Sequence, residues 1–577
     1  MKKYQEYMFN LELSRLKEYL GKNVVEMLVE WDPKGEANLT KQRLIYMIES
    51  LHGTSIFKKK EFRKDLLLSM RKEDVFQIRD NCLSAREKQE DDPLRLIEII
   101  ADKTWGNNQI SKYLLGMWGV DPAIVEKQAS SDENISNDIS AGKRFFELLD
   151  YQYYIKQRVL YNLNSGNLQE RLLVHMPTGT GKTKTTMHII ANYISFSLNK
   201  KGIVIWVAHT TELLQQAYNT FVDVWSHLGD GDIKAYKLWG SKDIVDTDTS
   251  LDGIVFCGLA KLMSIADSNP ALYERLKRDC RLVVFDEAHK AAAKKTRNVI
   301  EGLLRMPEGY ENRALVGLSA TPGRTTEASY DNNLLANMFG NKLISIDTNL
   351  INQINMGKLR ALNTLAESNI IKYFQHRRIL SKIEVKRLVY QTEFSAEDIK
   401  LLSKALRKIG YDETDFSDKQ LQLFAFNKAR NRKIMEELRD LYNRNVPTIV
   451  FACSVDHAKM LSAMLTLEGI DNSLVIGEMN PVDRNSAIEA FKDRSNKTNI
   501  LINYEVLTTG FDSKNIRCVF ITRPTKSVVL YSQMLGRGLR GPAMGGNESC
   551  LLIDIDDNLK AFDNETAFLH FNDYWFS

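Results

Sequence analysis

A glycine-rich octapeptide restricts the possible folds of this 577-residue chain more than any other part of its sequence. The apolar run at 172–174 leads into MPTGTGKT at 176–183, and a helix-prone stretch follows. Gly179 and Gly181 allow backbone N–H groups to turn inward around phosphate oxygens, and a helix that begins after them points the positive end of its dipole at the same anion. The order of strand, loop and helix therefore predicts a phosphate-binding loop, and a chance glycine turn is a poor alternative in that setting.

Two side chains of this loop have predicted roles with a nucleoside triphosphate and its metal ion. Lys182 is expected to reach the β- and γ-phosphates, and the Thr183 hydroxyl is expected to ligate Mg²⁺. The first loop position is Met176, where most phosphate loops have glycine. The other residues of the predicted ATP-binding loop are Pro177, Thr178, Gly179, Thr180 and Gly181.

An acidic segment about a hundred residues further on supplies the predicted metal carboxylate. RLVVFDEAHK at 281–290 places Asp286 and Glu287 directly after an apolar run of the kind that forms buried parallel strands. A carboxylate at such a strand end holds Mg²⁺ through water, and its neighbour orients and deprotonates the attacking water. On its own, Asp-Glu after a strand is weak evidence. Together with the phosphate loop it predicts ATP hydrolysis, with Asp286 at the metal and Glu287 as general base.

The pattern of apolar residues divides the chain into three parts. Up to about residue 128, spacings such as those of Phe9, Leu13, Leu16 and Leu20 predict helices, and the polar stretch 130–140 predicts a linker. Strand-like apolar runs then alternate with helical patterns to about residue 350 and again from 448, with a charged, helix-prone stretch between.

The predicted domains follow from that division. They are a helical N-terminal domain with its linker over 1–140, an α/β lobe over 141–350, and a helical connection with a second α/β lobe over 351–577. Because the linker is polar, a chain that begins near Ala141 is expected to fold without the N-terminal helices.

Composition and cysteine usage exclude several classes of protein. The 78 Lys and Arg residues against 74 Asp and Glu residues give a formal net charge of +4, which excludes a histone-like polycation and still allows local basic grooves. The six cysteines are scattered without a C-x-x-C pair, so a zinc ribbon, an iron–sulfur cluster and a disulfide framework are not expected. The charged first twenty residues and the short apolar runs predict neither a signal peptide nor a membrane span, and the expected location is the cytoplasm.

Several motifs in a fixed order give the chain a family resemblance over about 145–577. The phosphate loop, DEAH at 286–289, SAT at 319–321 and QMLGRGLR at 533–540 resemble motifs I, II, III and VI of the superfamily 2 helicases. VAHTTELLQQ at 207–216, TIVFACSVDHA at 448–458 and LINYEVLTTGFD at 501–512 resemble motifs Ia, IV and V. The nearest similarity is to the branch of type III restriction helicase subunits and related bacterial repair and defence helicases. It implies an α/β protein with two tandem RecA-like lobes of parallel sheet that bind ATP between them.

The resemblance also implies roles for residues around ATP. Gln152 in LLDYQ would recognise adenine, with Gln157 as a rival at the same helix start. Arg537 and Arg540 occupy the positions of arginine fingers, with Gly536 beside them, and Asp512 would bind the ribose, with Gly510 next to it.

Further implied roles couple ATP to nucleic acid. His289 would contact Gln533 across the cleft, and Ser319 and Thr321 would link closure of the lobes to the nucleic-acid side. The predicted contacts to the phosphate backbone are Thr210, Thr211, Thr508 and Thr509. Two departures from the family pattern are VFCGLAKL at 255–262, which has no clear motif Ib threonine, and Ser513-Lys514 where proline is common.

The function favoured by the motifs is that of a DNA helicase or duplex DNA translocase. An RNA helicase is the second interpretation, and an ATP-gated nucleic-acid sensor or scaffold that recruits a partner is the third. The N-terminal region shows no convincing nuclease motif, so nuclease activity is expected in a partner protein that binds this domain. A role in restriction, phage defence or repair is suggested by analogy alone.

Overall fold

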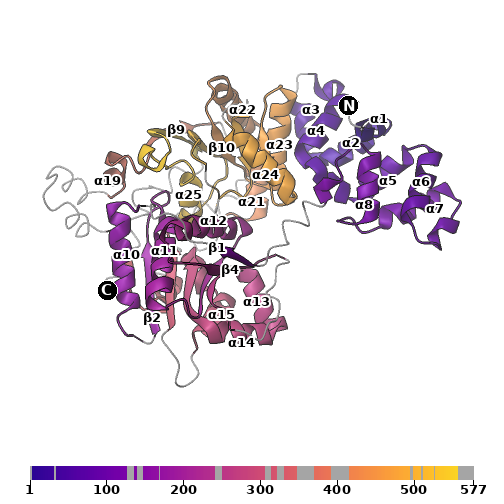
Figure 1. The fold of residues 1–577 in the computed structure, drawn as a ribbon. Coiled ribbons are helices and arrows are strands. Elements are labelled where there is room, and N and C mark those ends of the chain that lie inside the picture. Colours follow the sequence, from indigo (N-terminus) through magenta and orange to yellow (C-terminus); the bar gives the residue numbers. More distant parts are fainter. Residues whose placement is uncertain are drawn as a thin grey trace.

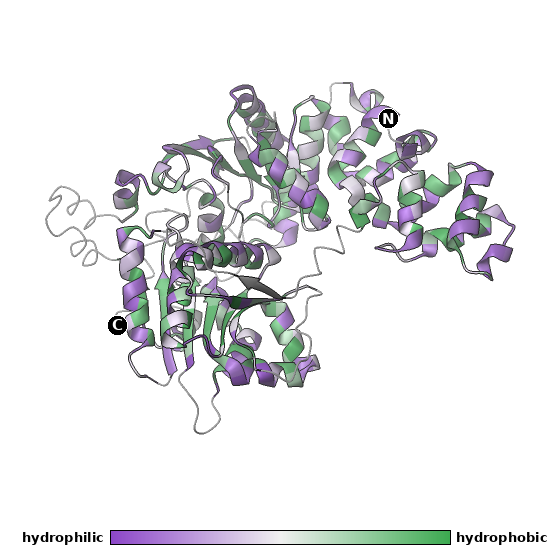
Figure 2. Cartoon of the chain, viewed as in Figure 1, coloured by the Kyte–Doolittle hydropathy of each residue, from purple (hydrophilic) through white to green (hydrophobic). Residues whose placement is uncertain are grey.

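The computed structural model consists of two α/β lobes, with the N-terminal helices packed beside the second lobe (Figure 1). The structure describes residues 3–31, 34–125, 136–139, 147–167, 169–240, 250–305, 313–320, 330–346, 370–390, 415–493, 498–508, 511, 513–525 and 527–556. Apolar residues concentrate in the strands and on the inner helix faces, and polar residues on the outside (Figure 2). Among the described residues, no helix has the length and apolar character needed to cross a membrane.

The first lobe is built on an eight-stranded sheet with the strand order β1-β4-β5-β3-β6-β7-β2-β8. Every neighbouring pair is parallel except β1 and β4. Strands β3, β5 and β7 are buried at every residue, as expected for a parallel sheet covered on both faces. The strands are β1 (Ser136–Ile139), β2 (Gln169–His175), β3 (Ile203–Ala208), β4 (Ile233–Leu238), β5 (Gly253–Gly258), β6 (Cys280–Asp286), β7 (Arg313–Ser319) and β8 (Leu343–Ser345).

Helices cover both faces of this sheet in two separate apolar clusters. One cluster includes side chains of α10 (Asp150–Leu163), α11 (Lys182–Asn192) and α12 (Thr211–Leu228). The other includes side chains of α13 (Leu259–Ser268), α14 (Pro270–Asp279), α15 (Lys294–Leu304) and α16 (Tyr330–Met338). Connections that alternate between the faces bring all the carboxyl ends of the parallel strands to one edge of the sheet.

The second lobe has a six-stranded sheet with the order β11-β12-β10-β13-β14-β9, in which every neighbouring pair is parallel. Its strands are β9 (Lys382–Leu388), β10 (Thr448–Phe451), β11 (Ser473–Val475), β12 (Ile500–Asn503), β13 (Cys518–Ile521) and β14 (Ser549–Ile555). Its helices are α21 (Asp418–Ala425), α22 (Lys428–Asn443), α23 (Val455–Leu467), α24 (Pro481–Lys492) and α25 (Val528–Leu535). Two parallel sheets in one chain confirm the predicted fold class.

Two edge strands correct the sequence-based assignment of secondary structure. Part of the predicted linker is β1, which pairs antiparallel with β4. Part of the predicted helical connection is β9, which pairs in parallel with β14, although α21, α22 and α19 (Ile370–His376) in the same stretch are helices. Most residues of β9 are exposed, and Lys386 pairs with Glu437. An edge strand forms backbone hydrogen bonds on one side only and accommodates charged side chains, so neither strand has the apolar run by which strands are recognised.

In the described residues 3–31 and 34–125 of the N-terminal domain, the regular structure is helical, as predicted. Leu16 and Leu20 are buried and Phe9 is half exposed. Trp105 and Trp118 stack on Phe57 inside the domain. The helices are α1 (Lys3–Phe9), α2 (Leu13–Leu20), α3 (Lys22–Trp31), α4 (Lys41–His52), α5 (Lys60–Leu68), α6 (Lys72–Cys82), α7 (Pro93–Asp102) and α8 (Gln109–Met117), with a 3₁₀ turn η2 (Gly53–Lys58).

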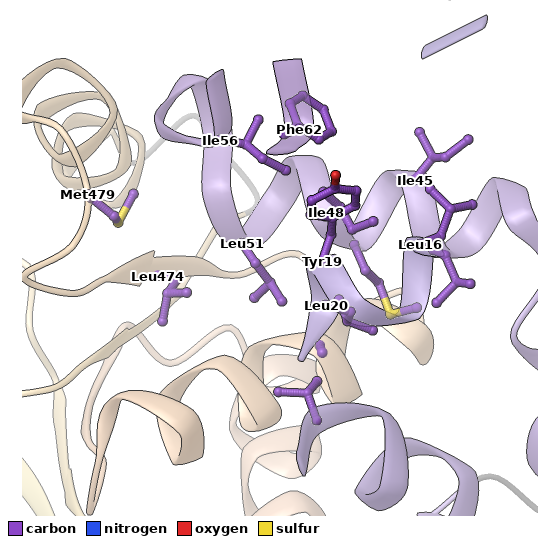
Figure 3. Packing of buried hydrophobic residues seen from close by; sticks show 14 of the residues in the cluster. Leu16, Tyr19, Leu20, Ile45, Ile48, Leu51, Ile56, Phe62, Leu474 and Met479 are labelled. Atoms are coloured by element: carbon purple, nitrogen blue, oxygen red, sulfur yellow. The ribbon is translucent and has the colours of Figure 1, made fainter. Parts of the chain in front are cut away.

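This domain shares one apolar cluster with the second lobe. Leu51 and Ile56 face Leu474 and Met479 of that lobe (Figure 3). Polar contacts flank the cluster: Asn23 Nδ2 donates to Asp456 at 3.3 Å, Trp31 Nε1 donates to Glu468 at 3.1 Å, and Lys428 lies 2.8 Å from Glu30. The N-terminal domain is therefore joined to the rest of the chain by more than the polar stretch before Ala141, because it packs against residues of the second lobe that lie far away in sequence.

We accordingly expect a chain that begins at Ala141 to be unstable or aggregated. The truncation uncovers apolar side chains of the second lobe and removes β1 from the edge of the first sheet. Each large apolar side chain returned to water costs about 1.5–3 kcal/mol, and a whole protein is stable by only about 5–15 kcal/mol. Thermal unfolding and size-exclusion chromatography of the truncated and full-length chains measure the effect. A monomeric truncated protein with the melting temperature of the full chain would contradict this prediction.

Candidate active site

The predicted phosphate-binding loop lies between the end of β2 and the start of α11. Gly179 and Gly181 have φ values of 84° and 82°, in the left-handed region that glycine adopts without strain. The Thr180 hydroxyl donates to the Pro177 carbonyl at 2.7 Å and fixes the turn. Met176 is fully buried in the core at the end of the strand. The loop thus has the backbone form of an anion cradle at a helix N-terminus.

Two side chains of helix α10 form hydrogen bonds to this loop. Gln152 Nε2 donates to the Thr180 carbonyl at 2.9 Å, and the Tyr151 hydroxyl donates to the same oxygen at 2.6 Å. Gln152 Oε1 accepts from Leu149 N at 3.0 Å. A Cβ atom at Gly181 would lie 2.3 Å from Gln152 Nε2, so this contact needs glycine there. Of the two glutamines weighed from the sequence, Gln152 contacts the loop, whereas Gln157 is exposed.

The two carboxylates follow β6 and approach the loop. Asp286 Oδ1 accepts from Glu287 N at 2.9 Å, and Glu287 Oε1 lies 4.0 Å from Lys182 Nζ. Burial raises the pKa of Asp286 above its usual value. Burial alone would also raise the pKa of Glu287, but the Lys182 charge and the adjacent His289 side chain hold it well below its usual value. Glu287 has φ 54° and ψ 53°, a left-handed conformation that costs a non-glycine residue about 1–3 kcal/mol and is common at active sites.

The second lobe reaches Glu287 from the opposite side. Gln533 Nε2, on α25, donates to Glu287 Oε2 at 3.4 Å, and His289 Nδ1 lies 3.2 Å from the same oxygen. His289 and Gln533, which the sequence predicts to meet across the cleft, both lie next to this oxygen of Glu287. A Cβ atom at Gly536 would lie 2.3 Å from Thr178 Cγ2, so glycine allows the end of α25 to approach the phosphate loop.

Both predicted arginines lie in the same cleft as the loop and the carboxylates. Arg537 Nε donates to the Gln533 carbonyl at 3.2 Å, and its Nη1 donates to the Phe511 carbonyl. The cleft has a volume of about 480 Å³. Among the residues that line it are Thr178, Gly179, Gly181, Lys182, Thr183, Asp286 and Glu287 of the first lobe and Gly536, Arg537 and Arg540 of the second. One ammonium group, two carboxylates and two guanidinium groups thus surround one space. These are the kinds of groups that take part in phosphoryl transfer.

The other predicted residues lie away from this cleft or outside the described residues. Ser319 is buried at the end of β7. Thr210 caps α12 by accepting from Leu213 N at 3.3 Å, and Thr211 is exposed beside it. The Thr508 hydroxyl donates to the Glu505 carbonyl at 2.5 Å. Thr321, Thr509, Gly510 and Asp512 lie outside the residues that the structure describes.

The structure adds residues of α12 to the cleft that the sequence analysis did not select. Gln216, Thr220 and Asp223 line it together with Leu213. The three polar residues are spaced by four and three, which places them on one helix face. Their common position on one face of an amphipathic helix that follows a predicted strand is the signal by which they could have been found.

Family models match both lobes at the positions of this cleft. Residues 145–324 match the model "Type III restriction enzyme, res subunit", and residues 430–541 match "Helicase conserved C-terminal domain". The chain belongs to the superfamily 2 helicases. Each lobe of this helicase therefore carries its own family signature, and the cleft lies between them.

Curated relatives are similar to this helicase at low identity. "Putative ATP-dependent helicase IRC3" of Saccharomyces cerevisiae is 24% identical over 417 residues, which are 71% of this chain and 51% of that protein. "Type I restriction enzyme EcoAI endonuclease subunit" of Escherichia coli is 22% identical over 72% of this chain and 47% of that protein. "ATP-dependent DNA helicase uvsW" of Enterobacteria phage T4 is 22% identical over 78% of this chain and 79% of that protein. The helicase spans about half the length of the first two.

Proposed function

We propose that this helicase is an ATP-dependent nucleic-acid motor that acts on DNA, either by unwinding it or by translocating along the duplex. One observation carries the proposal: Lys182, Asp286 and Glu287 of the first lobe and Arg537 and Arg540 of the second line a single cleft. Because neither lobe holds a complete set of these groups, hydrolysis requires the lobes to be closed. ATP binding and product release are then linked to the relative motion of the lobes.

Each side chain has a definite part in this reaction. Lys182 and the backbone N–H groups of the loop bind the β- and γ-phosphates of ATP, with Gln152 supporting the loop and recognising adenine. Glu287, held as a carboxylate by Lys182 and His289, orients the attacking water and accepts its proton. Arg537 and Arg540 neutralise charge that develops on the transferred phosphoryl group, since guanidinium keeps its charge and presents a planar fork to phosphate oxygens.

The donor set also fits a magnesium ion. Thr183 and Asp286 line the same cleft, and a hydroxyl with a carboxylate oxygen is the kind of ligand pair that Mg²⁺ takes beside phosphates. Held by these two residues, Mg²⁺ would offset the negative charge of the triphosphate. Asp286 would then ionise readily, because a cation beside it opposes the effect of burial.

Coupling and nucleic-acid contacts remain assigned by the family pattern. We propose that Gln533 and His289, through their contacts with Glu287, couple the bound nucleotide to closure of the lobes. Ser319 and Thr321 are proposed to couple that closure to nucleic-acid binding. Gly510 and Asp512 are proposed for the ribose. The proposed contacts to the nucleic-acid phosphates are Thr210, Thr211, Thr508 and Thr509. Such contacts are independent of sequence and weaken with salt.

The preference for DNA and the biological setting rest on relatives alone. A phage DNA helicase and a type I restriction endonuclease subunit are among the similar proteins, which supports a role on DNA in restriction, phage defence or repair. We place this work in the cytoplasm, with nuclease activity supplied by a partner protein that binds the N-terminal domain. An RNA helicase is the second candidate, since "DEAD-box ATP-dependent RNA helicase 13" of Arabidopsis thaliana is 32% identical over 111 residues.

ATP turnover of the purified protein with single-stranded DNA, duplex DNA and RNA tests the proposal. We expect DNA to stimulate turnover more than RNA, and duplex DNA to do so if the motor translocates on intact duplex. Stimulation by RNA alone would identify an RNA helicase. Displacement of a protein block from DNA in the presence of ATP would distinguish a moving motor from an ATP-gated sensor, which would turn over ATP and leave the block in place.

Replacing Glu287 by glutamine separates ATP binding from hydrolysis. The amide keeps the size of the side chain but cannot accept a proton, so we expect ATP to bind and turnover to fall by about 10²–10⁴-fold. The variant should also hold DNA longer in ATP than in ADP, because the closed state persists. Fluorescent-nucleotide binding, steady-state turnover and DNA dissociation rates measure the three effects. Normal turnover in this variant would show that Glu287 is not the base.

A further inference from the structure

The contact between the N-terminal domain and the second lobe has a polar centre at the first turn of α24. Asn480 caps this helix, and its Oδ1 accepts from Asp483 N at 2.8 Å. The Asp483 carboxylate accepts from the backbone N–H groups of Thr54 at 2.8 Å and Ser55 at 3.2 Å, at the start of η2. The Thr54 hydroxyl donates to the same carboxylate at 3.0 Å. We call Thr54, Ser55, Asn480 and Asp483 the lock.

Asn480 also donates hydrogen bonds to the two hydroxyl groups of the lock. Asn480 N donates to Ser55 Oγ at 2.9 Å, and Asn480 Nδ2 donates to Thr54 Oγ1 at 2.9 Å. A Cβ atom at Gly53, whose φ is 50°, would lie 2.6 Å from Asp483 Oδ2, so only glycine allows the carboxylate to come this close. Hydrogen bonds from backbone N–H groups to a carboxylate are charge-assisted and short. Together with the surrounding apolar cluster (Figure 3), they make the N-terminal domain and α24 one rigid unit.

The residue after Asp483 crosses to the other lobe. Arg484 Nη1 donates to Glu212 Oε1 of α12, and Arg484 Nη2 donates to the Gly477 carbonyl at 3.3 Å. Both side chains are largely buried, with 18% of Arg484 and 26% of Glu212 exposed. We call the Arg484–Glu212 pair the latch. It joins the lobes beside Thr210 and Thr211, on the side where nucleic acid is proposed to bind.

We propose that the N-terminal domain is a positioning element of the motor: through the lock it fixes the first turn of α24, and so holds Arg484 where the latch can close the lobes. This inference rests on the proposed function. The lock and the latch are made by adjacent residues of one helical turn, so the contacts that hold Asp483 in place also position the backbone of Arg484. Thr54, Ser55 and Asp483 are positioning residues that act through Arg484.

The lock can be weakened from the N-terminal side without touching either lobe. Thr54→Val with Ser55→Ala removes the hydroxyl contacts and leaves the two backbone N–H donors, whereas Asp483→Ala removes the acceptor of those donors. Glu212→Ala removes the latch. Closure is measured by fluorescence transfer between dyes on α10 and α22, attached at Tyr161→Cys and Glu436→Cys in a Cys82→Ser background, with a non-hydrolysable ATP analogue and DNA. Both labelled positions are exposed. The second measurement is the DNA concentration that gives half-maximal ATP turnover, with kcat recorded separately.

We expect each change to lower the closed fraction and to raise the half-stimulating DNA concentration by about tenfold, within the usual range of coupling between sites. The maximal turnover rate should change little, because the cleft residues are intact. Lock and latch variants combined should show the same tenfold effect rather than a hundredfold one, since both act through Arg484. Lys428→Ala, which removes another contact between the domain and the second lobe, is the matched control and should change neither measurement.

A wild-type closed fraction in the lock variant, with a lowered one in Glu212→Ala, would overturn the proposal. Effects that multiply in the combined variant would do the same. Where the double substitution does not fold, Asp483→Asn carries the same test with the shape of the side chain preserved. If closure responds as expected but no nucleic acid stimulates ATP turnover, the proposed function fails while the positioning role stands.

Discussion

Replacing Lys182 by alanine is expected to lower ATP turnover by about 10³-fold or more and to weaken nucleotide binding sharply. Lys182 is the first residue of α11, it lines the cleft, and its ammonium lies 4.0 Å from Glu287. The neutral backbone donors of the loop cannot replace a full positive charge at the β- and γ-phosphates. The change should also raise the pKa of Glu287, since the Lys182 charge is the largest of the effects that lower it.

Steady-state turnover and fluorescent-nucleotide binding measure this effect. Lys277 supplies a matched control, because it lies on α14 of the same lobe, does not line the cleft and pairs with Glu274 at 3.1 Å. Lys277→Ala should leave turnover within a few-fold of wild type. Near-normal turnover in Lys182→Ala would show that ATP does not bind at this loop. It would also contradict the assignment of the protein as an ATP-driven motor.

Arg537 and Arg540 belong to the second lobe, and replacing either by alanine is expected to lower ATP turnover strongly. An arginine finger typically contributes about 10³–10⁵ in rate, so the variant that lacks the finger should lose at least 10³-fold. Nucleotide binding should weaken only modestly, because the phosphate loop belongs to the first lobe and is unchanged. Lysine should rescue poorly, since it restores the charge without the planar fork.

A double substitution shows whether the two lobes act on one transition state. Arg540→Ala combined with Glu287→Gln should cost far less than the product of the single effects, because either change alone already disables the same step. Arg439→Ala, in an exposed ion pair with Glu468, is a control of the same residue type and should leave turnover unchanged. Wild-type turnover in both Arg537→Ala and Arg540→Ala would mean that the second lobe does not complete the active site.

The phosphate loop and the carboxylates could be predicted because their signals are local. Gly179 and Gly181 must precede α11 for the loop to form, and Asp286 must follow a buried strand, so a few adjacent residues suffice. Arg537 and Arg540 were placed only by the family pattern. Residues 537–540 lie near Lys182 because α25 packs against the loop, and Gly536 allows this close approach. The sequence around 537–540 does not by itself indicate that packing.

The contacts that the sequence did not reveal are made between distant segments. Strands β1 and β9 lie at sheet edges, where partner strands supply the hydrogen bonds and apolar patterns are weak. The docking of the N-terminal domain depends on pairs such as Thr54 and Asp483, which are more than 400 residues apart. The contact of Gln533 with Glu287 was missed for a similar reason, because motif spacing does not identify a buried oxygen that side chains of two lobes share.

ATP binding and DNA binding should depend on each other if the motor is driven by closure of the two lobes. Both ligands then favour one closed state, so the wild-type protein should bind DNA more tightly with a non-hydrolysable ATP analogue than without it. DNA should tighten binding of the analogue by the same factor, expected at about 5–150-fold. Fluorescence anisotropy with labelled DNA, and separately with labelled analogue, measures both factors. Equal factors well above one support a nucleic-acid motor driven by closure of the two lobes, whereas independent binding of the two ligands would contradict it.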